Sequence, residues 1–235
     1  MSDAVAREIL GHADDNLVMA QQLSQWVAAA PDLELDIALG NIALDHLGVA
    51  RSLLTRFGEL EGVGRTEDDL AMFRGEREFT NLLICEQPNG DFGYTIARQL
   101  VFDAYQVGLW EMLTDSTDSE LSAVAAKARL EARYHWQHSQ TWAALLGHGT
   151  EESKRRMQAG LGAVARFVDE LFNEHPELRP GFDERIGSAL GEAGLELQAD
   201  PFPQRGGRAG LHTEYLGHLL AEMQSLARAH PGVKW

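Results

Sequence analysis

The chain has little of several features that would mark a particular class of protein. Its single cysteine, Cys85, excludes a disulfide framework and any zinc or iron–sulfur site held by cysteines. Lys and Arg number only 20 against 36 Asp and Glu, which gives a net charge of −16. Such a surface repels phosphate backbones and anionic lipids, so we expect neither nucleic-acid binding nor a basic membrane anchor.

Long apolar runs are absent as well. No segment of the sequence approaches the roughly 18 uncharged apolar residues that a membrane-spanning helix needs, so we expect none. The N-terminal segment carries Asp3, Arg7 and Glu8 and lacks the apolar stretch of a signal peptide. We therefore expect a cytoplasmic protein that is not bound to a membrane.

What is present favours helices. Ala and Leu together number 62 against 17 for Val and Ile, and 44% of the residues are hydrophobic, which suffices for a core. Apolar residues recur with the helical period, and we find no convincing strand pattern. The main expected helices cover about residues 5–29, 32–60, 92–113, 116–146, 151–172, 183–197 and 211–229. The sequence thus predicts an all-α protein, a four-helix bundle with additional helices, in a single domain over residues 1–235.

Three of these helices carry polar residues inside apolar runs, where a bundle would bury its core. They are Asn41 and Asp45 in the second helix, Gln99, Asp103 and Gln106 in the helix over 92–113, and Glu131, His135 and His138 in the helix over 116–146. A dimetal site in a four-helix bundle uses such positions. It needs a Glu from each of two helices and a Glu-x-x-His pair from each of the other two.

The sequence matches this di-iron ligand pattern only in part, because two of its histidines are missing. Gly48 stands three residues after Asp45, and Tyr134 stands three residues after Glu131, where histidine would be needed. His135 comes one residue late, which rotates it by ~100° around the helix. We therefore interpret these residues as a degenerate di-iron-like polar stripe, and we expect no metal, no cofactor and no catalytic residue in this chain. A solvated face or a hydrogen-bonded core would explain the same residues.

Several stretches of the sequence resemble a known family. They are NLLICEQPNGDFGYTIARQ at 81–99, LEARYHWQHS at 130–139, GLHTEYLGHLLAEMQSLAR at 210–228 and the terminal PGVKW, with a weaker match at about 174–205. They resemble the C-type subunits of phenylacetyl-CoA epoxidase, the multicomponent ring 1,2-monooxygenase of aerobic phenylacetate degradation.

This resemblance implies a ferritin-like bundle that acts inside a complex. In that family a homologous A-type subunit carries the di-iron site and binds the CoA ester, and the C-type subunit is its non-catalytic structural partner. Further oxygenase subunits and a reductase with flavin and iron–sulfur groups would complete the assembly. The resemblance thus places every cofactor outside this chain.

Two other functions compete with this interpretation. The chain would be a self-sufficient di-iron oxygenase if Asp45, Asp103, Glu131 and His135, with Gln21 as a further candidate, bound iron in a non-standard arrangement. Without imidazole at residue 48 such a site would hold Fe(II) weakly. The chain could also be a free-standing homo-oligomer with a ligand pocket. For the complex, we expect an apolar surface of the last expected helix, or of the helix that contains His46, to be covered by the A-type subunit. A last helix that packs on its own core would explain the same apolar band.

Overall fold

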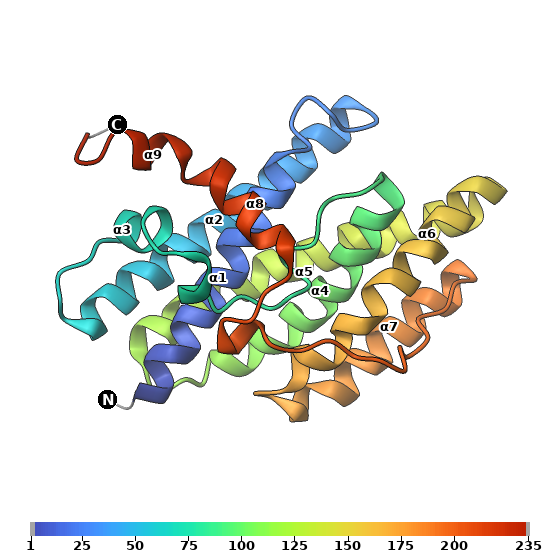
Figure 1. Ribbon diagram of the computed structural model, residues 1–235. Coiled ribbons are helices and arrows are strands. Elements are labelled where there is room, and N and C mark those ends of the chain that lie inside the picture. The colour runs from blue at the N-terminus through green and yellow to red at the C-terminus, as the bar shows by residue number, and fades with distance from the viewer. Residues whose placement is uncertain (1–2, 234–235) are drawn as a thin grey trace. The chain divides into compact units, whose positions relative to one another are not determined.

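We describe residues 3–233 of the protein from a computed structural model (Figure 1). This range is helical and holds no strand, which confirms the predicted all-α class. None of its helices is both long and apolar enough to cross a lipid bilayer. The last two residues of the PGVKW motif lie outside the described residues.

The chain divides into two compact units. Unit 1 combines residues 1–88 with residues 206–235, and unit 2 consists of residues 89–205. The expectation of a single domain over residues 1–235 stays a prediction.

Unit 1 is built on two long helices that pack against each other, α1 (Asp3–Ser24) and α2 (Leu33–Glu61). The side chain of Asp32 begins α2 by accepting a hydrogen bond from the backbone N–H of Leu35 at 2.8 Å. Thr66 and Asp69 form a capping box at the start of the short α3 (Glu67–Met72). The C-terminal part of the chain adds α8 (Glu214–Met223) and α9 (Ser225–Ala229).

Unit 2 is centred on α4 (Phe92–Leu113), which begins at the predicted cap, Asp91. The elements around it are α5 (Ser119–His148), α6 (Glu151–Val164), a 3₁₀ helix (Ala165–Phe172) and α7 (Arg179–Ala193). Most residues of α4 are buried, because α5, α6 and α7 all pack against it. Gly160 lets α6 approach α4, since a Cβ there would lie 2.9 Å from the Cα of Tyr94.

Two helix boundaries differ from the prediction because of local backbone chemistry. The first helix ends at Ser24 instead of about residue 29, and Ala28 beyond it has a positive φ of 65°. The N–H of Ala28 donates to both carboxylate oxygens of Asp36, which holds this turn. Helix α7 begins four residues early because Pro180 is tolerated in a first turn, and Gly194 ends it in the left-handed conformation.

Two further boundaries were also misjudged. The helix predicted from residue 116 begins at Ser119, because Asp118 supplies the cap to the N–H of Leu121. The last predicted helix divides into α8 and α9 at Gln224, whose side-chain amide donates to the carbonyl oxygens of Ala71 and Arg74.

The apolar band of this C-terminal segment is divided as well. Leu216, Leu219 and Leu220 are buried, whereas Leu211 and Leu226 are exposed.

Candidate functional site

The polar row predicted on α4 lies inside the protein. Gln99, Asp103 and Gln106 are each at most 2% exposed, although they follow one another at i, i+4 and i+7 in an apolar helix. Within residues 89–205 no side-chain oxygen or nitrogen of these three residues has a hydrogen-bond partner of good geometry. A buried polar group in this condition costs about 1–3 kcal/mol, so the row is kept at the expense of stability.

Helix α5 brings one imidazole to this row. His135 is buried, and one of its ring nitrogens lies within 4.8 Å of a carboxylate oxygen of Asp103. Glu131 and His138 are half-buried, and Glu131 forms an ion pair with Lys127 at 3.1 Å. The structure therefore brings Asp103 and His135 together, with Glu131 one turn before His135 on the same helix.

Burial dominates the electrostatics of the row. It raises the pKa of Asp103 from 3.8 to about 7, although the charge of His135 and the Ser139 hydroxyl act in the opposite direction. Burial, reinforced by the charge of His135, lowers the pKa of His138. Asp103 is thus largely protonated below pH 7, and it can donate a hydrogen bond as well as accept one.

The prediction for α2 was wrong about the face of the helix. Asn41 is exposed and Asp45 is only half-buried. The buried polar residue of this helix is His46, whose Nδ1 lies 2.7 Å from Oδ1 of Asn16 in α1. The segment has apolar residues on every side, so its periodicity did not reveal which side packs inward.

A buried polar cluster in α1 escaped the sequence analysis. His12, Asp14, Asp15 and Asn16 are at most 1% exposed, whereas Gln21, the candidate iron ligand of this helix, is only half-buried. The signal was present in the run HADDN, four polar residues that interrupt the middle of a long helix.

The acids of this cluster bind arginines from distant parts of unit 1. Asp14 forms a buried ion pair with Arg74 and accepts a hydrogen bond from the N–H of Thr80 at 2.8 Å. Asp15 pairs with Arg208 at 2.6 Å. Burial alone would raise the pKa of Asp15, but Arg208 and His12 outweigh it, so that the pKa is lowered. These residues hold unit 1 together.

Glu86 forms a second buried junction, between the segment before α4 and the start of α8. Its carboxylate accepts hydrogen bonds from Thr213 N–H at 2.6 Å, His212 Nδ1 at 2.8 Å and Asn81 Nδ2 at 2.9 Å. The Nε2 of His212 lies 2.9 Å from the carbonyl oxygen of Phe79, so both ring nitrogens face acceptors and the ring is an imidazolium. Burial opposes the charge, but these hydrogen bonds raise the pKa of His212 overall.

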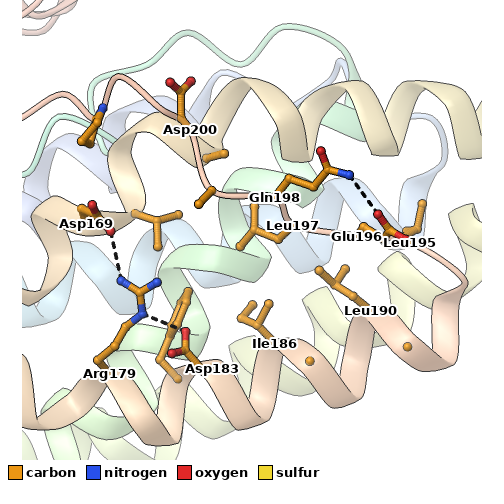
Figure 2. Close-up of a pocket in the computed structure, with 17 residues that line it drawn as sticks. Asp169, Arg179, Asp183, Ile186, Leu190, Leu195, Glu196, Leu197, Gln198 and Asp200 are labelled. Carbon is orange, nitrogen blue, oxygen red and sulfur yellow. Dashed lines mark hydrogen bonds and ion pairs between the residues drawn. The ribbon is translucent and has the colours of Figure 1, made fainter.

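Unit 2 also contains a cavity of about 600 Å³ under the segment 195–203 (Figure 2). Apolar side chains of α7, such as Ile186 and Leu190, line one side of it, and Arg179 lies between Asp169 and Asp183 at its edge. Because Arg179 is already paired with two carboxylates, the cavity offers no uncompensated cation at this edge to an anionic ligand.

The fold and the buried polar row define the class of the protein: a helical protein of the ferritin-like type with carboxylate and imidazole groups in its interior. The whole chain, residues 1–235, matches the family described as "Phenylacetic acid catabolic protein", and it belongs to this family. It is 44% identical over 237 residues to the C-type subunit of 1,2-phenylacetyl-CoA epoxidase from Escherichia coli strain K12. The match covers 94% of this chain and 95% of that relative, so the predicted resemblance is confirmed.

The residues at the predicted ligand positions do not fit the di-iron site that ferritin-like carboxylate proteins build. Tyr134, at the place of one histidine, is 53% exposed, and Gly48, at the place of the other, offers no ligand atom. Glu131 is engaged with Lys127. In the described part of unit 2 this leaves Asp103 and His135 as the adjoining donors, which is far short of two Glu and two Glu-x-x-His pairs.

Proposed function

We propose that this chain is a non-catalytic structural subunit of a multicomponent phenylacetyl-CoA 1,2-epoxidase of aerobic phenylacetate catabolism. It pairs in the cytoplasm with a homologous A-type subunit that carries the di-iron site. Further oxygenase subunits and a reductase with flavin and iron–sulfur groups complete the complex. The 44% identity to the C-type epoxidase subunit of Escherichia coli supports this assignment.

The observation that carries the non-catalytic role is the loss of imidazole at Gly48 and Tyr134. A buried carboxyl and a buried imidazole survive at Asp103 and His135, but the exposure of Tyr134 removes the position that a second metal ligand would need. These observations support a subunit that has a bundle scaffold without the ligand set of its catalytic homologue.

Reconstitution tests the proposal. The A-type subunit and its reductase are assayed for epoxidation of phenylacetyl-CoA with and without this chain, and the iron content of each purified subunit is measured. We expect turnover only when both subunits are present, with iron in the A-type subunit. Full turnover without this chain refutes the structural role, and turnover by this chain with the reductase alone establishes the self-sufficient oxygenase instead.

A further inference from the structure

Unit 1 carries an apolar groove of about 710 Å³ between α1 and α2. The hydrophobic residues that shape it are Val27, Ile37, Leu44, Leu47, Met72 and Met223. Leu44 is 64% exposed, Ile37 57% and Leu47 45%, so these side chains leave much of their apolar surface in water. Contiguous exposed surface of this kind marks an interaction site more often than a solvated face.

The spacing of the groove residues on α2 fits a second helix. Ile37, Gly40, Leu44 and Leu47 follow one another at steps of three, four and three, which is the seam along which two helices pack. A Cβ at Gly40 would meet only Cγ2 of Val27, at 3.8 Å. This chain's own packing therefore does not require the glycine, whereas a neighbouring helix could approach closely there.

The charges around the groove indicate what kind of helix it binds. Between residues 8 and 50 the sequence has seven Asp and Glu and no Lys or Arg. Asp14 and Asp15 are buried and paired with arginines, whereas Asp36 lines the groove itself. A second copy of this chain would bring the same acidic groove and a further charge of −16.

We propose that the groove is the docking site for an amphipathic helix of the catalytic A-type subunit. The helix places apolar side chains in the seam and Lys or Arg residues beside it, opposite Asp36. The inference rests on the proposed pairing of the two subunits, and it assigns that pairing to a surface.

The test compares two leucines of nearly equal exposure. Leu44→Glu places a charge in the groove, and Leu130→Glu, at a residue that is 60% exposed on α5, is the matched control. The dissociation constant of each variant and of the wild type with the purified A-type subunit is measured at low and high salt. We expect Leu44→Glu to raise the constant by about 30-fold or more, as for a central interface residue, and Leu130→Glu to change it by less than about twofold. Circular dichroism shows that both variants are folded.

The outcomes separate this inference from the proposed function. If the wild type binds the A-type subunit and Leu44→Glu binds equally well, the groove is not the docking site, although the pairing stands. If the wild type does not bind at all, the pairing and the groove assignment both fail. A photo-crosslinker at residue 44 identifies the occupant: crosslinks to the A-type subunit support the proposal, and crosslinks to a second copy of this chain overturn it.

Discussion

Asp103→Asn should stabilise the protein, and the gain should grow as the pH rises. The pKa of Asp103 is about 7 in the folded chain and 3.8 as its ordinary value, so the unfolded chain releases this proton at lower pH than the folded chain. Wild-type stability must then fall as the pH rises from about 4 to about 7, where the folded state binds more protons than the unfolded state. Asparagine cannot ionise, so the stability of the variant does not fall with pH for this reason.

The magnitude follows from the separation of the two pKa values. At 1.36 kcal/mol per pH unit, the free energy of unfolding of the variant should exceed that of the wild type by about 2 kcal/mol at pH 5.5. The gain should reach about 4 kcal/mol above pH 7, because the shift from 3.8 to about 7 is then fully expressed. These values are upper estimates, since the asparagine amide also lacks partners in this site.

Urea unfolding at several pH values measures the effect, followed by tryptophan fluorescence, to which the buried Trp110 of α4 contributes. The range from pH 5.5 to 8.5 avoids the isoelectric point near 4.9. Asp115→Asn, at an exposed residue just beyond α4, is the control and should reproduce the wild-type pH profile. The reasoning fails if the Asp103 variant runs parallel to the wild type at every pH, or if its advantage shrinks as the pH rises.

Three further predictions test other parts of the structure. Glu86→Ala leaves the buried imidazolium of His212 unpaired and should cost about 3–5 kcal/mol in urea unfolding. In the wild type, the raised pKa of His212 should stabilise the folded state fully below pH 6.5, and this stabilisation should be lost at higher pH. Limited proteolysis of the C-terminal segment at several pH values measures the change. Gly147→Ala should lower the melting temperature because its Cβ would collide with the carbonyl oxygen of Ala193, whereas Gly162→Ala, with nothing within 4 Å, should add about 0.5–1 kcal/mol. Elemental analysis after expression with added iron should find no stoichiometric iron in the purified chain; about two atoms per chain would refute the scaffold interpretation.

The sequence predicted α4 and its polar row because the residues that determine both lie within the helix or next to it. Asp91 marks the start of the helix, and the surrounding residues are apolar on every face, so the sequence predicted the burial of Gln99 and Asp103 without showing which side faces inward. The same uniformity made the prediction for α2 wrong. There the apolar residues also lie all round, but only one side is covered, and Asn41 falls on the other side.

The cluster in α1 could not be predicted with its partners. Asp14 and Asp15 are buried because Arg74 and Arg208 neutralise them, and these arginines lie 60 and 193 residues away along the chain. Helical periodicity reports only on neighbours within a few turns, so acids that are satisfied over such distances look like surface residues. The run HADDN can be recognised as a buried cluster only when the fold shows that Arg74 and Arg208 pair with its acids.

The division of unit 1 between the two ends of the chain has a consequence for biosynthesis. Asp15 and Glu86 are made early, but Arg208 and His212 belong to the segment that leaves the ribosome last. At a synthesis rate of ~5–20 residues per second, translation of residues 89–205 leaves these acids without their cations for at least roughly 6–23 s. Unit 2, which is continuous in sequence, can fold in that interval, whereas unit 1 is completed only when the C-terminal segment arrives. A nascent chain that ends before residue 206 therefore lacks the cations that compensate the burial of Asp15 and Glu86.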